Sequence, residues 1–318
     1  MPTTRHTRTA ALAVATAALA LTAACGTQHG TDAAGEGHRA GNHAPALPDA
    51  KDRAAWPRPN VEHGLAKGMR LPLESYMLGY PAVVDVENAR DIVKQQCMQR
   101  LGFQFTPNPS GTQPAASYDA INMERRYGIT DPAKAAAHGF ALAQNVGDPS
   151  ETEEDAELAR EDQESSVEGW DKAMNETCIP EANKTVGVLF PTDVAGDLAA
   201  QSLKATREQP VVQRGLASWS SCMAGRGHQV KSLDDAEGRF ARPEGAGAQP
   251  QKAEVSMATD DVACKKTVGL VATWYKTETA YQIKQIEEHR EELEAEKAHD
   301  AGLVKKARAV LARYKTAR

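Results

Sequence analysis

Five cysteines carry the chemistry that this sequence displays most plainly, and one of them stands apart from the others. Cys25 follows residues 9–22, an almost uninterrupted run of Ala, Leu, Val and Thr, and residues 1–8 carry two arginines and a histidine but no acidic residue. A charged segment ahead of an apolar one is typical of a secretory signal. The apolar run is shorter than the roughly 20 residues that a spanning helix needs. We therefore expect residues 1–24 to be a removable signal peptide.

The residues before Cys25 indicate what happens to its thiol. Ala23-Ala24-Cys25 resembles the lipobox of bacterial lipoproteins, in which small residues precede a cysteine that is linked to diacylglycerol and becomes the mature N-terminus. Leu21 stands one position earlier than is common in that motif. The alternative is an ordinary signal peptide that is cut near Ala24. The resemblance implies a lipid anchor at Cys25 on the outer face of the cell membrane, where several acyl chains hold a protein far better than one.

Residues 25–59 predict a flexible tether between this anchor and the folded part. Gly, Ala, His, Pro, Thr and Asp dominate the segment, and they bury too little apolar surface to offset the entropy cost of ordering. His29, His38 and His43 lie in it at irregular spacing, without the acids or cysteines that complete a metal site. We expect them to be solvated, and we assign no metal ligand and no cofactor.

The charge balance argues against one class of partner. The chain has a net charge of -6, and loss of residues 1–24 with their two arginines changes it to -8. Contacts to phosphates need clustered Lys and Arg. We therefore expect no nucleic-acid partner.

The other four cysteines are Cys97, Cys178, Cys222 and Cys264. An even number of cysteines in an exported chain indicates disulfides. Zinc is the competing interpretation, but the short paired spacings of zinc sites are absent. Two disulfides are expected.

A repeated motif suggests how these cysteines pair. Cys97-Met-Gln-Arg-Leu-Gly102 and Cys222-Met-Ala-Gly-Arg-Gly227 share the pattern C-M-x-x-x-G, and each ends an amphipathic segment. Asp85 is the expected N-cap of the first helix, and a glycine after each helix can adopt the left-handed conformation that ends it. The repeat predicts two similar half-units, at about 80–185 and 190–297. If each half-unit holds its own disulfide, the favoured pairing among the three possible ones is Cys97–Cys178 and Cys222–Cys264.

A third segment adds to this pattern. In residues 125–140, RRYGITDPAKAAAHGF, Asp131-Pro132 predicts a helix start and Gly139 its end. Together with the two C-M-x-x-x-G segments, this stretch resembles a group of uncharacterised actinobacterial lipoproteins and secreted proteins, over roughly residues 80–280. The resemblance implies an extracytoplasmic location and a disulfide-linked helical fold, and it brings no catalytic residues.

The fold class follows from helical periodicity. Residues 186–190 are the one short β-like run, so a mainly α fold is expected, as one helical domain over residues 60–318. Residues 259–297 contain no proline and one glycine, Gly269, which predicts a single long helix. Residues 300–302 are expected to break it ahead of a helical extension at 298–318.

The two halves of this long helix differ in character. The first half is apolar and aromatic, and we expect Trp274 and Tyr275 to be buried. The second half is mainly charged, and two interpretations stay open for it: residues 287–297 project into solvent as an arm, or the helix folds back on its own domain.

Two classes of function remain. The first is a non-catalytic, membrane-anchored accessory protein that binds a protein of the cell envelope. The second is a cell-wall enzyme: Glu74-Ser75 resembles the catalytic Glu-Ser of soluble lytic transglycosylases, although the Gly-Leu-Met-Gln and Asn-Tyr motifs of that family are missing. His228 has no partner carboxylate in the sequence motif around it, so we expect a surface histidine. Capture of a solute is a further alternative. We assign no catalytic residue, and favour binding.

Overall fold

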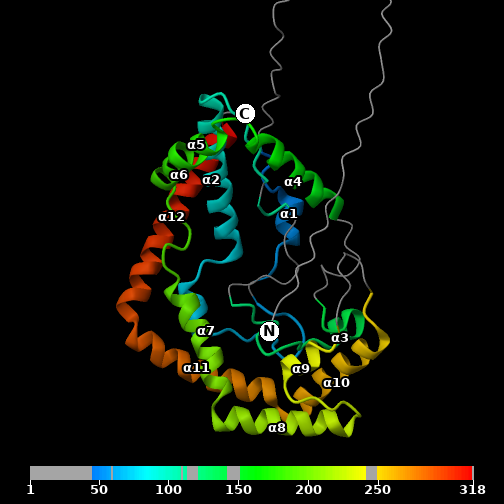
Figure 1. Cartoon of the computed structure of the whole chain (residues 1–318). Helices are drawn as coiled ribbons and strands as arrows, with labels where there is room; N and C mark the ends of the chain where they lie inside the picture. The colour runs from blue at the N-terminus through cyan, green and yellow to red at the C-terminus, as the bar shows by residue number, and fades with distance from the viewer. Residues whose placement is uncertain are drawn as a thin grey trace, which may run out of the picture. The chain divides into compact units, whose positions relative to one another are not determined.

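A computed structural model describes residues 45–58, 60–108, 110–112, 121–141, 151–240 and 249–316, with the side chains of 151–157 left out. Cys25 and the three tether histidines lie outside these residues. The described residues form helices and no strand, which confirms the mainly α fold (Figure 1). The elements are α1 (Ala50–Ala55), η1 (Pro72–Tyr76), α2 (Tyr80–Arg100), α3 (Pro132–His138), α4 (Glu151–Ser165), α5 (Trp170–Ala173), the π-helical turn η3 (Met174–Cys178), α6 (Ile179–Thr185), α7 (Val194–Arg207), α8 (Pro210–Gly225), α9 (Leu233–Glu237), α10 (Lys252–Val268), α11 (Leu270–Glu288) and α12 (Arg290–Thr316).

The main hydrophobic core lies where α7, α8, α10 and α11 meet. Trp219 on α8 and Leu270 at the start of α11 are fully buried in it, and Trp274 is nearly so. Trp219 also donates a hydrogen bond of 2.7 Å from Nε1 to Asp261 on α10, which satisfies the one polar atom of its ring. Tyr275 is only half-buried, and its hydroxyl donates to the Arg70 carbonyl.

A second core forms between α2 and α12, which pack side by side although they lie near opposite ends of the described chain (Figure 1). Val86 and Ala89 of α2 meet Leu303 and Ala307 of α12 there. Leu293, at the start of α12, is fully buried in the main core. The C-terminal helix therefore folds back on its own domain, as one of the two open interpretations has it, and residues 287–297 do not project as an arm.

The two disulfides join Cys97 to Cys178 and Cys222 to Cys264, with Cα atoms 5.5 and 5.7 Å apart. This is the pairing that the repeated motif predicts. Both copies of the motif also end their helices in the same way: Gly102 and Gly227 are left-handed, with φ of 85° and 90°, and the next amide donates a 2.9 Å hydrogen bond to the methionine carbonyl. This is the Schellman arrangement. The boundaries of the two half-units stay a prediction.

Two local expectations are wrong. Helix α2 begins at Tyr80 behind Gly79, with a proline in its first turn, and Asp85 lies inside it, paired with Arg308 at 3.0 Å. Residues 186–190 form no strand, since the chain turns there and Phe190 adopts a left-handed φ of 49°.

The expected single helix at 259–297 is divided in the structure. Gly269, with φ of 65°, separates α10 from α11, and His289 separates α11 from α12. Residues 300–302 continue α12 instead of breaking it. No helix in the described part of the chain is both long and apolar enough to cross a bilayer.

Helix α3 has the predicted caps, and it places the next segment of chain. Asp131 is the N-cap, accepting from the Ala133 amide at 2.8 Å, and Gly139 ends the helix with φ of 60°. Beyond it, the Phe140 amide donates to Glu254 on α10 at 3.1 Å. This contact fixes Phe140 at the edge of the pocket that is described in the next section.

Candidate functional site

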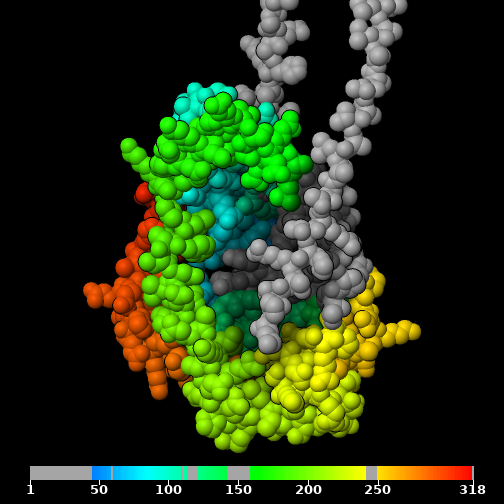
Figure 2. Space-filling model, in the orientation of Figure 1, coloured from blue at the N-terminus to red at the C-terminus, as the bar shows by residue number. Residues whose placement is uncertain are grey.

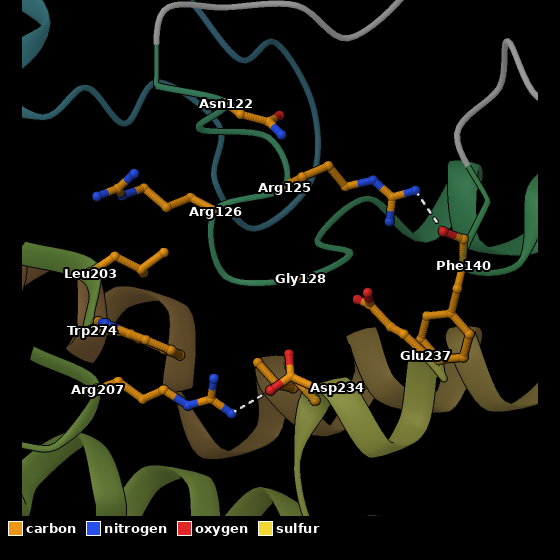
Figure 3. A pocket seen from close by; sticks show the side chains of 11 residues that line it. Asn122, Arg125, Arg126, Gly128, Phe140, Leu203, Arg207, Asp234, Glu237 and Trp274 are labelled. Carbon is orange, nitrogen blue, oxygen red and sulfur yellow. Dashed lines mark hydrogen bonds and ion pairs between the residues drawn. The ribbon is translucent and has the colours of Figure 1, made fainter. Parts of the chain in front are cut away.

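A pocket of about 340 Å³ opens between α7, α9, α11 and the loop ahead of α3. We call residues 121–130 the wall loop. In Figure 2 the dark green surface of segment 121–141 is recessed between the light green α7 and the yellow surface that includes α9. The pocket is lined by Asn122, Arg125, Arg126, Gly128, Phe140, Leu203, Arg207, Leu233, Asp234, Glu237 and Trp274 (Figure 3).

The wall loop needs special backbone conformations. Asn122 has φ of 51° and Gly128 φ of 73°, a region that asparagine tolerates and glycine adopts freely. A Cβ atom on Gly128 would lie 2.7 Å from Nζ of Lys265 and 3.3 Å from Oε1 of Glu237. The backbone of the wall loop therefore passes directly over two charged groups, which only glycine permits.

A buried ion pair fastens the wall loop to the core. Nε of Arg126 lies 3.0 Å from Oε1 of Glu278 on α11, and Tyr127 donates to the other carboxylate oxygen at 2.8 Å. Ser202 on α7 lies 2.6 Å from Oε1. Burial and the charge of Glu278 raise the pKa of Tyr127 well above its ordinary value, so its hydroxyl stays protonated. Glu278 neutralises Arg126, and this network is a structural anchor.

A second buried pair lies beneath the wall loop. Lys265 donates from Nζ to Asp261 at 2.8 Å and to the Ile129 carbonyl at 3.0 Å. Burial raises the pKa of Asp261, while Lys265 and the indole of Trp219 act in the opposite direction. The ammonium thus joins the wall loop to α10 through one backbone and one side-chain contact.

Two further arginines reach the pocket from opposite sides. Arg125 donates from Nη2 to the carbonyls of Phe140 and Ala141, at 2.9 and 2.6 Å. Arg207, at the end of α7, donates to Asp234 at 2.8 Å, with 34 % and 76 % of these two side chains exposed. Exposed ion pairs contribute at most about 1 kcal/mol. Arg207 can therefore exchange its partner at little cost, in contrast to Arg126.

Glu237, the last residue of α9, differs from the other charged groups of the pocket. Its carboxylate makes no hydrogen bond to any residue that the structure describes, and Figure 3 shows this carboxylate directed toward the wall loop. Desolvation by the surrounding wall raises its pKa, although the fields of Lys265 and Arg125 oppose the shift. The residue as a whole is exposed to solvent. Its carboxylate thus lies at the pocket wall without a hydrogen bond from the described chain, and water can reach it.

The residues singled out in the sequence lie elsewhere. Glu74 caps η1, accepting from the Leu71 amide at 2.8 Å and from Arg70 at 3.1 Å. His228 does have a carboxylate partner, because its Nε2 lies 2.9 Å from Asp260 on α10. Neither residue lines the pocket. Among the described residues, no group of three or more His, Cys, Asp or Glu side chains could hold a metal ion.

The pair at His228 has its own electrostatics. Burial acts to raise the pKa of Asp260, but hydrogen bonds from His228 and Arg226 outweigh it and lower the pKa overall. Asp260 is therefore ionised at neutral pH. Sequence reasoning missed this pair because its members are 32 residues apart. It missed the pocket as well, for which adjacent Arg125 and Arg126 in an otherwise mixed segment were the one visible signal.

Comparisons with known proteins give no relative: no protein family, no curated protein and no solved structure matches this chain. The pocket must therefore be interpreted from its own chemistry. Guanidinium groups and carboxylates converge over a floor of Trp274, Leu203 and Leu233. Such a combination of apolar walls and a few polar groups is typical of sites for small molecules.

Proposed function

We propose that this chain is a lipoprotein anchored at Cys25 to the outer face of the cell membrane, and that it acts through binding as an accessory protein of the cell envelope. The arrangement ahead of Cys25 carries the proposal: charged residues, an apolar run and small residues before the thiol. The two disulfides support it, since such bonds persist mainly outside the cytoplasm.

The tether matters for access to a partner. The expected tether is too long at its end, because residues 50–55 form α1 and Trp56 is buried. The remaining residues 26–44 would span roughly 25 Å as a flexible coil, enough to lift the helical body clear of the lipid headgroups. A protein of the envelope then meets the body rather than the anchor. Because α12 packs into both hydrophobic cores, the contact surface must be sought on the outer faces of the helices and not on a separate arm.

The pocket favours a second candidate function, the capture of a small solute. Glu237 and Arg207 face one cavity over an apolar floor, and neither is tied into the buried network around Glu278. The enzyme alternative gains no support from Glu74, because both of its carboxylate oxygens already hold groups of its own segment.

The lipid anchor at Cys25 is tested by the mass of the mature protein and by the cell fraction in which the protein is found. Intact-mass analysis of protein extracted from membranes should show cleavage after Ala24 and an added diacylglyceryl group. Cys25→Ala should move the protein to the soluble fraction, while both disulfides persist in non-reducing peptide maps. A mature form that begins elsewhere with an unmodified residue would contradict the proposal.

The partner is tested in place. Crosslinking on intact membranes, followed by mass spectrometry, should capture a defined envelope protein with the wild-type chain, and much less of it with Cys25→Ala at equal expression. If both forms captured the same proteins equally well, the anchor would not be needed for the interaction. Cleavage of peptidoglycan by purified protein, abolished by Glu74→Gln, would favour the enzyme.

A further inference from the structure

The pocket presents opposite charges to one small volume. Glu237 faces it from α9 and Arg207 from the end of α7, and Trp274 lies on the side of Arg207 as part of the floor (Figure 3). We propose that this pocket binds a small zwitterion of the amino-acid class with an apolar side chain, its ammonium at Glu237 and its carboxylate at Arg207. This rests on the binding function proposed above and names the ligand of its solute-capture form.

The ammonium is assigned to Glu237 because of what that carboxylate lacks. A carboxylate that the protein leaves without a hydrogen bond gains most from a donor that carries a positive charge. The nearest cations are already engaged elsewhere, since Lys265 binds Asp261 and Arg125 binds two backbone carbonyls. A ligand ammonium would supply the hydrogen bonds that no described residue gives to Glu237.

The carboxylate is assigned to Arg207 for the converse reason. The planar guanidinium binds carboxylates through two parallel hydrogen bonds, and its present partner, Asp234, is largely exposed to water. A ligand carboxylate inside the pocket would be screened less than Asp234 is. Arg126 is excluded from this role because Glu278 already neutralises it.

The floor predicts an apolar side chain on the ligand. Trp274 is held in place by a 3.0 Å hydrogen bond from its Nε1 to Thr206 and by the ring of Tyr127, whose centroid lies 5.1 Å away. Leu203 and Leu233 complete an apolar surface beside it. Because these groups are already ordered, little entropy is lost when a ligand packs on them.

Simpler ligands fit the pocket less well. A plain anion would bring its charge toward Glu237, and a plain amine would bring its charge toward Arg125 and Arg207. Like charges brought together in a partly dehydrated site repel strongly. A zwitterion meets both signs at once.

Calorimetric titration of the purified, full-length mature protein in detergent micelles tests the proposal. The probes are L-leucine and L-phenylalanine, with N-acetyl-L-leucine lacking the ammonium and L-leucinamide lacking the carboxylate. Leucine should bind at least tenfold more tightly than either N-acetyl-leucine or leucinamide. Equal binding of N-acetyl-leucine, equal binding of leucinamide, or absence of binding by both amino acids at millimolar concentration would each overturn the proposal.

Paired variants locate the site. Glu237→Gln and Arg207→Gln should each weaken binding of the amino acid at least tenfold, whereas the exposed controls Glu168→Gln and Arg214→Gln should leave it unchanged. A single cooperative thermal transition, at a temperature no lower than that of wild type, and intact disulfides would show that the variants fold. If the pocket variants bound as well as wild type, the site would be refuted. Lipidation at Cys25, measured separately by mass, would be unaffected by that result.

Discussion

Arg126 and Glu278 form an ion pair that is almost completely shielded from water, with side chains 6 % and 0 % exposed. They are 152 residues apart in the sequence, one in the wall loop and the other in the middle of α11. The pair holds one side of the pocket onto the main core. Loss of either charge would leave the other buried and uncompensated.

Arg126→Met should therefore destabilise the protein by about 3–5 kcal/mol, the usual cost of breaking a buried pair from one side. Urea unfolding followed by circular dichroism measures it. The control is Arg100→Met, which removes the exposed pair with Glu181 and should cost less than about 1 kcal/mol. The double variant Arg126→Met/Glu278→Leu should recover much of the loss. Equal effects of the two single variants would contradict a special role for the buried pair.

Gly128→Ala and Gly227→Ala separate backbone strain from steric contact. Both glycines have a positive φ, so each substitution should cost about 1 kcal/mol in strain. Only at Gly128 would the new methyl group also displace Nζ of Lys265, because nothing lies within 4 Å of the Cβ position at Gly227. The first variant should be clearly less stable than the second in thermal unfolding. Equal unfolding midpoints for the two variants would show that the side chain of Lys265 moves aside at little cost.

Each disulfide should stabilise the folded chain mainly by restricting the unfolded one. The bridged residues are 81 and 42 positions apart. Loop-closure entropy then gives about 4 kcal/mol for each bond. Replacement of Cys97 and Cys178 by alanine, and separately of Cys222 and Cys264, should lower the free energy of unfolding by amounts of this size. A loss below about 1 kcal/mol for either pair would mean that its unfolded state is already restricted.

Glu237→Gln should change how stability depends on pH. The pKa of Glu237 in the folded protein lies above its ordinary 4.5, so the folded state holds this proton more firmly than the unfolded state does. The contribution of the protonated Glu237 carboxyl to the free energy of unfolding is fully present below about pH 4.5, and it is lost as the pH rises through the folded-state pKa. The variant should match wild type in acid and be more stable at pH 7, by up to about 1 kcal/mol after screening by water.

Glu168→Gln, on an exposed carboxylate, should show no such divergence between acid and neutral pH. Unfolding free energies measured in urea across this range provide the comparison. A Glu237→Gln protein that became less stable at pH 7 would show that the carboxylate is held by a favourable contact.

Leu303→Ala tests the packing of α12 on α2. Leu303 is buried among apolar side chains of both helices, so its truncation should cost about 2–5 kcal/mol. Ile283→Ala, at a side chain that is largely exposed, should cost less than about 1 kcal/mol. Deletion of residues 287–318 should for the same reason destabilise the whole body. If α12 could be removed without loss of stability, the fold-back arrangement would be wrong.

The features that the sequence predicts correctly have local signals. Asp131 with Pro132 caps α3, and Gly102 and Gly227 end their helices, because a cap is encoded within a few residues. The disulfide pairing follows from the repeated motif around Cys97 and Cys222. The mainly α fold follows from periodicity and from the scarcity of strand signals.

The features that it does not predict depend on distant contacts. The helical pattern continues through Gly269 and His289, and the chain bends there because α10, α11 and α12 pack on different partners. Asp85 reads locally as an N-cap, yet its partner is Arg308, more than 200 residues away. The pocket likewise joins five separate segments, namely the wall loop, Phe140, α7, α9 and α11, which no local pattern connects.

The contact between α2 and α12 has a consequence for biosynthesis. A ribosome makes α2 long before α12, and the apolar face formed by Val86 and Ala89 lacks its α12 partners until that helix has been made. The Cys97–Cys178 bond closes within the earlier part, so oxidation of that pair does not have to wait for the C-terminus. We expect a nascent chain that stops short of Leu303 to contain this disulfide and still to expose apolar surface on α2. Chaperones and proteases recognise unfinished proteins by such exposed apolar surface.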